Sequence, residues 1–358
     1  MLSRAAIESH SIDIRQFIDF RQSTLVNGMR AIDVHNGSGL TFTLLPDRGM
    51  DIWAAHYHGL PLTWMSQASP HAPDFGAPWL RLFNGGLLTT CGLTHVGAPE
   101  TDSVTGEYRD IHGDYTRLRA YDISTSGGWQ GDKYIAELKC LVSQAMLFSE
   151  QLRVQRTYRI TLGEPTIEII DTVENLYDVP APLMLLYHFN VGYPLVREGA
   201  QLIVPTQATY PRDEAARKGI EHWAHYGGAT AGHHEEVFFH HVKADENHFA
   251  SAALLNTDFG LQFDWDTTHA AYLTQWKNLR RGIYVCGIEP GNCVPEGLNT
   301  ARAKGSVTML QPGAAQTFTN RVHVLHGATQ VDACRASLSV LEEQGHPVTN
   351  CDLTNYAD

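Results

Sequence analysis

Residues 152–173 read LRVQRTYRITLGEPTIEIIDTV and contain two predicted strands, Leu152–Ile160 and Thr166–Val173. Both are short and rich in β-branched or aromatic residues, and the turn-forming residues Gly163 and Pro165 separate them. The second strand alternates between apolar and polar side chains for only part of its length, which is typical of a strand covered on both faces. This stretch therefore predicts stacked β-sheets.

The same pattern recurs along most of the chain. Further strands are predicted at Leu40–Leu45, Ala252–Leu255, Gly282–Ile288 and Thr317–Leu325. Turn pairs separate the strands at Asn36-Gly37, Gly85-Gly86, Gly127-Gly128 and Pro312-Gly313. Helical patterns are few: Ile7–Phe20, a helical or irregular excursion at Asp213–His234, and one or two turns at Ala336–Glu343. The sequence predicts an all-β fold, a large sandwich of mostly antiparallel sheets with few short helices.

No repeat, low-complexity tract or polar linker divides the 358 residues. We therefore expect a single domain over residues 1–358, since β-sandwiches often run this long as one unit. Its core is expected at about residues 40–325, with the N-terminal segment 1–39 and the C-terminal tail 326–358 packed on it.

The charge of the chain argues against several classes of partner. There are 26 Lys and Arg against 39 Asp and Glu, and the net charge of −13 repels phosphate backbones and anionic lipids, so we expect no nucleic acid and no membrane partner. The six cysteines are scattered without a Cys-x-x-Cys pair, which indicates reduced thiols. The first residues, MLSRAAIESHSIDIRQF, carry charges where a signal peptide needs an apolar run. We expect a cytoplasmic protein, and a homodimer is left open.

Two ionisable side chains directly follow apolar strands. His188 ends the run Leu183-Met-Leu-Leu-Tyr-His, and Glu289 lies in Gly287-Ile-Glu-Pro-Gly. Placed at a sheet edge or concave face, an imidazole and a partly buried carboxylate can transfer protons near neutral pH. The structural alternatives are a core histidine satisfied by backbone groups and a glutamate that caps the strand in a salt bridge. The polar neighbour Asn190 weakens the first alternative.

Other polar candidates lie in turns or near aromatic residues. His112 precedes a glycine in a turn able to approach a ligand, or is a surface histidine. Arg81 and Asn84 combine a donor fork and an amide beside aromatic residues, a mixture that suits sugar hydroxyls and apolar sugar faces. Arg48 offers the same guanidinium donors in a tight turn. Either arginine could instead form a structural ion pair with an aspartate. Trp276 is a candidate for stacking on a ligand or for the core.

The 19 histidines raise the question of a metal site. His56 and His58 would share one face of a strand, and His233-His234 and His240-His241 add further candidates. None falls at a recognised ligand spacing, and neither a phosphate-binding glycine motif nor a nucleophile elbow occurs. We therefore expect no metal and no cofactor.

Five short motifs occur in a fixed order: LPDRGMDI (45–52), NGGLLTTCGL (84–93), IHG (111–113), HFNVGYPL (188–195) and IEPGN (288–292). Together they resemble the aldose 1-epimerase and galactose mutarotase-like superfamily, in its divergent bacterial branch known as domain of unknown function 4432. The resemblance implies a β-supersandwich. It also implies that His188 is the general acid, Glu289 the general base, and His112 a second histidine near the sugar ring oxygen.

The resemblance also implies a set of substrate-binding residues. Arg81 is similar to the family's substrate-binding arginine, and Arg48 competes for that role. The family's usual aspartate has no clear match, and Glu236 is the nearest candidate. The remaining expected sugar contacts are Asn84, Asn190 and Trp276. The chain departs from the family pattern where Phe-Asn follows His188 directly and where Pro follows Glu289.

The implied activity is mutarotation of a small sugar. A base takes the proton of the anomeric hydroxyl while an acid on the opposite side protonates the ring oxygen, and the ring opens and recloses. Two alternatives remain open from the sequence: a sugar or uronate isomerase, epimerase or lyase that uses a divalent metal, and a carbohydrate-binding protein without chemistry. Two arginines near the site would suit a carboxylated or sulfonated sugar.

Overall fold

The strands predicted within residues 152–173 are β11 (Gln151–Thr161) and β12 (Thr166–Asn175), which pair antiparallel. In β12, fully buried residues alternate strictly with half-buried ones. The second face is therefore only half covered, because it carries charged residues: Glu168 pairs with Arg159 at 2.5 Å and with Arg321 at 2.8 Å. One covered face of this strand supplies the core, and the expectation of two covered faces is wrong.

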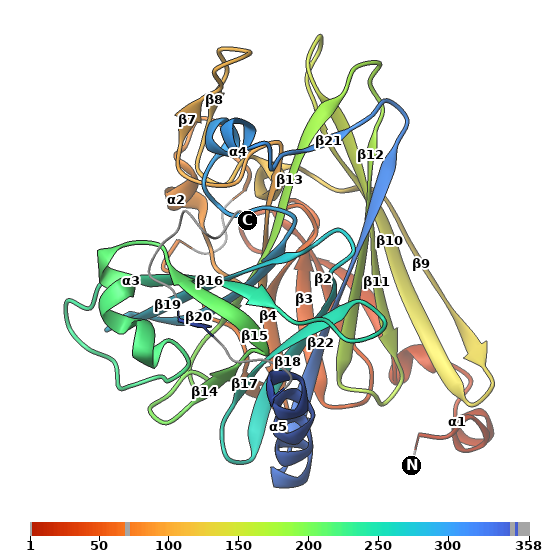
Figure 1. Cartoon of the computed structure of the whole chain (residues 1–358). Coiled ribbons are helices and arrows are strands. Elements are labelled where there is room, and N and C mark those ends of the chain that lie inside the picture. Colours follow the sequence, from red (N-terminus) through yellow and green to blue (C-terminus); the bar gives the residue numbers. More distant parts are fainter. Residues whose placement is uncertain (1, 69–71, 344–347, 350–358) are drawn as a thin grey trace.

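The computed structural model describes residues 2–68, 72–343 and 348–349, and these residues form three large sheets and one small one (Figure 1). Sheet one contains, in order, β1 (Asp19–Thr24), β2 (Arg30–His35), β3 (Leu40–Leu45), β4 (Asp51–Tyr57) and β5 (Leu60–Pro61). Sheet two contains, in order, β14 (Gln201–Ile203), β17 (Phe249–Leu255), β18 (Phe259–Asp266), β22 (Ala315–His326), β12, β11, β10 (Lys133–Ala145) and β9 (Tyr121–Gln130).

Sheet three carries the site described below. Its order is β21 (Thr308–Leu310), β13 (Ala181–Val191), β20 (Ile283–Gly291), β19 (Tyr272–Arg280), β16 (Glu236–Val242), β15 (Thr206–Pro211) and β23 (Val348–Thr349), and β6 (Leu88–Leu93) also pairs with β13. A small sheet joins β7 (Glu100–Thr101) to β8 (Tyr108–Arg109). Among the described strands, every pair is antiparallel except β15 with β23. The predicted all-β, mostly antiparallel sandwich is confirmed.

The main hydrophobic core lies between the sheets. One cluster joins Phe42 of β3, Tyr158 of β11 and Leu185 of β13. The rings of Phe189 on β13 and Phe263 on β18 lie 5.1 Å apart, across the interface between sheets three and two. The odd-numbered residues of β13 therefore face the core, and its even-numbered residues are left for the opposite face of sheet three.

Short helices lie around the sheets (Figure 1). They are α1 (Arg4–His10), α2 (Trp79–Leu82), α3 (Glu214–Gly219), α4 (Leu298–Lys304) and α5 (Ala328–Glu343), with 3₁₀ turns at Ile14–Gln16, Tyr115–Arg117 and Ile220–His222. No helix in the described part of the chain is long and apolar enough to cross a membrane.

Two helix predictions were wrong in extent. The helix expected at Ile7–Phe20 ends at His10, and the chain enters β1 at Asp19 because that strand pairs with β2. The helix expected at Ala336–Glu343 begins eight residues earlier, because Val331, Cys334 and Leu338 pack on sheet two. The rest of the predicted tail, residues 344–347 and 350–358, lies outside the described residues. The excursion at Asp213–His234 is confirmed, with α3 and a 3₁₀ turn followed by irregular structure.

Candidate active site

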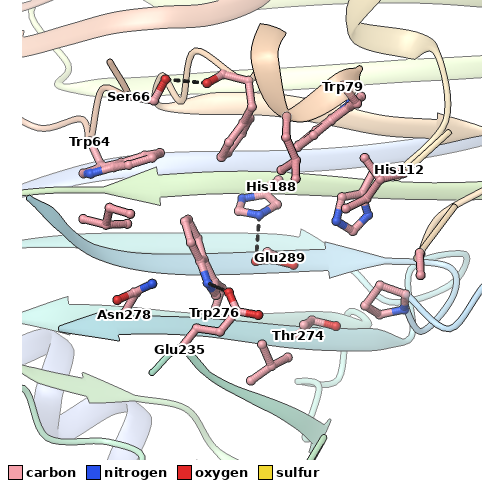
Figure 2. Close-up of a pocket in the computed structure, with 18 of the residues that line it drawn as sticks. Trp64, Ser66, Trp79, His112, His188, Glu235, Thr274, Trp276, Asn278 and Glu289 are labelled. Atoms are coloured by element: carbon pink, nitrogen blue, oxygen red, sulfur yellow. Dashed lines mark hydrogen bonds and ion pairs between the residues drawn. The ribbon is translucent and has the colours of Figure 1, made fainter. Parts of the chain in front are cut away.

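The face of sheet three that points away from the core carries a cleft of about 770 Å³. Alternate residues of β19, Thr274, Trp276 and Asn278, line it, because successive side chains of a strand point to opposite faces. His188 on β13 and Glu289 on β20 reach the same cleft from adjacent strands (Figure 2). The cleft floor is therefore built from rigid, hydrogen-bonded strands.

The strand that carries His188 is anchored from its inner face. Tyr187 points into the core and donates its hydroxyl to Asp171 Oδ2 at 2.8 Å. Asp171 pairs with Arg156 at 2.7 Å, and Arg156 pairs with Asp51 at 3.0 Å. This buried network ties β4, β11 and β12 to β13, so that His188 is presented to the cleft from a fixed backbone.

His188 and Glu289 contact each other, with Nε2 and Oε1 3.1 Å apart and with side chains only 8% and 4% exposed. Burial lowers the pKa of His188 to about 3, and the neighbouring His112 acts in the same direction. Burial raises the pKa of Glu289 well above its usual value. Both directions favour the uncharged forms, a neutral imidazole and a protonated carboxyl. The expected acid and base therefore lie side by side on adjacent strands.

Gly287 makes room for this pair. It faces Trp276 across the β19–β20 ladder. A Cβ atom at this position would lie 2.7 Å from Glu289 Oε1 and 2.8 Å from the Trp276 Cβ, closer than Cβ atoms approach other heavy atoms. The absence of a side chain at residue 287 therefore allows Glu289 and Trp276 to occupy the cleft floor together.

His112 lies on the cleft wall in a left-handed backbone conformation, with φ of 56°. Its N–H donates to the Gly97 carbonyl and its carbonyl accepts from the Gly92 N–H, both at 2.9 Å. The imidazole lies edge-on to Trp79 at 5.2 Å and to His188 at 6.4 Å between ring centroids. Burial lowers the pKa of His112 to about 4, and Nδ1 has no hydrogen-bond partner among the described residues. A buried polar atom without a partner on a cleft wall is suited to a ligand hydroxyl.

Aromatic rings pack against the His188 imidazole, and one of them, Trp276, lies beside Glu289 (Figure 2). Phe83 lies 5.6 Å and Trp276 5.5 Å from the imidazole between ring centroids. Trp64 packs edge-on against Trp276 at 5.6 Å, and Trp79 stacks on Phe83 at 4.7 Å. Rings held in this way offer flat apolar surfaces next to polar groups, a combination typical of small-molecule sites.

A carboxylate and an arginine that the sequence analysis missed complete the cleft. Glu235 Oε2 accepts a hydrogen bond from the Trp276 indole at 2.9 Å, and its Oε1 accepts one from Arg212 at 2.8 Å. Arg212 also pairs with Asp213 at 2.8 Å. The available signal was the position of Arg212 at the end of a strand, directly before the predicted excursion.

Residues 26–324 match the family described as a domain of unknown function, DUF4432. The chain belongs to this family. Among curated proteins, no relative matches this DUF4432 protein.

Solved structures resemble this DUF4432 protein over most of its length. A Klebsiella pneumoniae protein, assigned by inference as an aldose 1-epimerase, shares 28% identity and a TM-score of 0.88, covering 92% of this chain and 89% of its own. A galactose mutarotase-like protein from Clostridium acetobutylicum and a galactose 1-epimerase from Lactobacillus acidophilus each share 13% identity, with TM-scores of 0.59 and 0.56, and each comparison covers 87% of this chain and 99% of the other. The last two show the fold alone. The galactose mutarotase-like fold expected from the five motifs is confirmed.

Four of the predicted residues meet in the cleft of the DUF4432 protein: His188, Glu289, His112 and Trp276. The two predicted arginines do not line it. Arg81 is exposed on α2 with its side chain outside the cleft lining. Arg48 is buried, and its guanidinium donates to backbone carbonyl groups, including that of Leu82 at 2.9 Å. Its role is therefore structural.

The other expected sugar contacts also lie outside the cleft lining. The buried amides of Asn84 and Asn190 donate to backbone carbonyls, at 3.2 Å to Gly85 and at 3.0 Å to Gly86. Glu236 pairs with Lys277 at 3.4 Å on the other face of the sheet. Adjacent strand residues point to opposite faces, so the carboxylate in the cleft is the preceding residue, Glu235.

No group of three or more His, Cys, Asp or Glu side chains suited to a metal ion occurs within the described residues. His240 is a core residue; its Nδ1 lies 3.1 Å from the Thr209 hydroxyl and its Nε2 lies 3.2 Å from the side-chain Oε1 of Gln275.

Proposed function

We propose that this DUF4432 protein is an isomerase of the aldose 1-epimerase type, which interconverts sugar anomers by acid–base ring opening and closure. The observation that carries the proposal is the buried contact between His188 and Glu289 on the floor of an aromatic-lined cleft. Acid and base groups whose pKa values are shifted by burial, in contact within a cleft, are typical of proton-transfer sites. The Klebsiella pneumoniae relative, assigned by inference as an aldose 1-epimerase, supports the same reaction class.

The side-by-side geometry suits mutarotation, because the two oxygens that exchange protons sit on one carbon. Transfer of the Glu289 proton to His188, whose Nε2 lies 3.1 Å from Glu289 Oε1, would make an ionised base and a protonated acid without exchange with solvent. Glu289 then removes the proton of the anomeric hydroxyl, and His188 protonates the ring oxygen. Ring opening gives an aldehyde, and reclosure after rotation reverses both transfers. His112 lies close enough to stabilise the charge that develops on the oxygens.

The charge of the cleft supports an uncharged sugar as substrate. Arg212 is the only Lys or Arg among the described residues that line the cleft, and Asp213 and Glu235 already pair with it. A carboxylated or sulfonated sugar would meet the Glu235 carboxylate without a free cation to balance its own charge. The two arginines on which the charged-sugar hypothesis rested are Arg48 and Arg81, which lie outside the cleft lining.

The test is NMR exchange spectroscopy of anomer interconversion across aldoses, ketoses and sugar acids. We expect His188→Asn and Glu289→Gln each to lose about 10²- to 10⁴-fold in rate. Because the two groups act as one unit, the double variant should lose little more than either single variant. Glu296→Gln is the matched control, since Glu296 is paired with Lys304 away from the dyad.

The same experiment separates the alternatives. Retained exchange in both single variants would contradict the assigned roles, and multiplied losses in the double variant would contradict the claim that the two groups act as one unit. A loss of activity on chelation that returns with a divalent metal would favour the metal-dependent isomerase. Binding of sugars without exchange of any anomer would favour a carbohydrate-binding protein.

A further inference from the structure

The cleft is long in the direction of its strands. Ile283 and Glu289 both line it and lie six residues apart on β20. A strand rises about 3.3 Å per residue, so these two positions are roughly 20 Å apart. Asn278 and Thr274 span the same direction on β19. The volume of about 770 Å³ lies in the upper part of the range of roughly 300–1,000 Å³ found for drug-sized ligands.

The proton-transfer groups mark one part of this length. In Figure 2, His112 lies on one side of His188 and Glu289, and Trp64 and Asn278 lie on the other side. The anomeric carbon of a bound sugar must lie at the dyad for proton transfer. A pyranose is a single six-membered ring, so a monosaccharide in that position reaches Trp276 and leaves the end at Trp64, Asn278 and Ile283 open.

This open end has the chemistry of a second sugar site. Trp64 is only half-buried, yet its indole is held edge-on to Trp276 at 5.6 Å and next to Phe83 at 5.8 Å. Ile283 keeps 37% of its surface exposed at the rim, and Asn278 places a carboxamide on the floor. A rigid indole provides a face for the C–H surface of a sugar ring. The Asn278 Oδ1 accepts from the Arg280 N–H at 3.0 Å, and its Nδ2 can donate to a sugar hydroxyl.

We infer that the cleft binds reducing oligosaccharides of uncharged sugars, with the reducing-end ring at the His188–Glu289 dyad and the next ring against Trp64 and Ile283. The inference rests on the proposed function only in placing the reducing-end ring at the dyad. The length of the cleft and the chemistry of its open end are independent of that assignment.

Calorimetric titration with monosaccharides and disaccharides tests it directly. The probes are D-glucose and D-galactose against maltose, cellobiose and lactose. We expect at least one disaccharide to bind about tenfold more tightly than either monosaccharide, the effect of burying on the order of 50 Å² of additional apolar surface. Trp64→Ala and Ile283→Asp should abolish that difference. Ile12→Asp, at an exposed isoleucine outside the cleft lining, is the matched control and should retain it.

The inference is overturned if no disaccharide binds more tightly than the monosaccharides, if no sugar binds, or if the advantage survives in both Trp64→Ala and Ile283→Asp. Ile283 lies at the rim, so Ile283→Asp, unlike Trp64→Ala, tests the second ring site without removing a packed indole. Anomer exchange measured on the same samples separates the two claims. Exchange of monosaccharides without a disaccharide advantage removes the extended site alone, and a disaccharide advantage without exchange of any sugar removes the proposed reaction alone.

Discussion

Gly287→Ala tests the arrangement of the site by adding a single Cβ atom between Glu289 and Trp276. The added Cβ would lie 2.7 Å from Glu289 Oε1, 2.8 Å from the Trp276 Cβ and 3.4 Å from His188 Cε1. The Glu289 carboxylate can rotate away, but the Trp276 Cβ is attached to the backbone of β19 and cannot. The substitution therefore forces both a displaced carboxylate and a shift between β19 and β20.

The size of the effect follows from these contacts. Overpacking a well-packed site costs about 1–3 kcal/mol, and the lower entropy of alanine in the unfolded chain offsets about 0.4–1 kcal/mol of it. We expect a net loss of about 1–2 kcal/mol, visible as a fall in Tm of a few degrees. A catalytic group moved by about 1 Å costs on the order of 10²-fold in rate, so anomer exchange should fall by about that factor.

Differential scanning calorimetry and NMR exchange spectroscopy measure the two quantities. Gly128→Ala is the matched control. The turn expected at Gly127-Gly128 was wrong: both residues lie within β9, and an added Cβ at Gly128 meets no atom within 4 Å. This control variant should leave both Tm and exchange unchanged. If Gly287→Ala keeps exchange within about threefold of the wild-type rate, Glu289 does not act from the position described, and the reasoning is refuted whatever happens to Tm.

Three further outcomes are expected. Arg48→Ala should lower the free energy of unfolding, measured in urea, by about 2–4 kcal/mol, because it leaves buried carbonyl groups without donors. Arg81→Ala should change neither the free energy of unfolding nor anomer exchange, because Arg81 lies outside the cleft lining. A larger loss of stability in Arg81→Ala than in Arg48→Ala would contradict the structural role of Arg48. Glu235→Gln should raise KM about tenfold with little change in kcat, because the carboxylate orients the Trp276 indole; an equal fall in kcat in steady-state kinetics would instead place it in the chemical step. Burial lowers the pKa of His240 to about 4 from 6.5, so between these pH values the folded state binds fewer protons than the unfolded chain, and the stability present above pH 6.5 is lost as the pH falls. His240→Gln should remove about 1.4 kcal/mol per pH unit of this loss. Parallel curves of Tm against pH for the wild type and the variant would disprove this.

Local patterns were sufficient where the structure depends on neighbours in sequence. The strands at Leu152–Ile160 and Thr166–Val173 were predicted nearly to their ends, because β-branched residues and the turn between them are local signals. The long C-terminal helix was underestimated, because its first half is stabilised by packing on sheet two, in which the nearest partners are far along the chain. Helices of this kind depend on tertiary burial more than on propensity.

The cleft shows the same division. His188 and Glu289 could be predicted because each is an ionisable residue at the end of an apolar run. The expected position after the strand was wrong: ladder pairing continues past both residues, so His188 lies within β13 and Glu289 within β20. The pairing of Glu235 with Trp276 could not be predicted, because the two residues are 41 positions apart and meet only through the pairing of β16 with β19. Glu235 and Glu236 are neighbours in sequence, but their side chains lie on opposite faces of the sheet, so an error of one residue selects the carboxylate outside the cleft.

From its sequence alone this protein could be assigned an all-β sandwich, a net negative charge and a candidate histidine and glutamate in apolar strand segments, since alternation, turn residues and composition are local or additive properties. Only the tertiary structure decided that the acid and the base touch at 3.1 Å, that Arg48 is structural and Arg81 exposed, and that a cleft of about 770 Å³ runs past Trp276 to Trp64. The physical reason is that strand register and the stacking of sheets bring together residues from distant parts of the chain, and burial then sets their protonation.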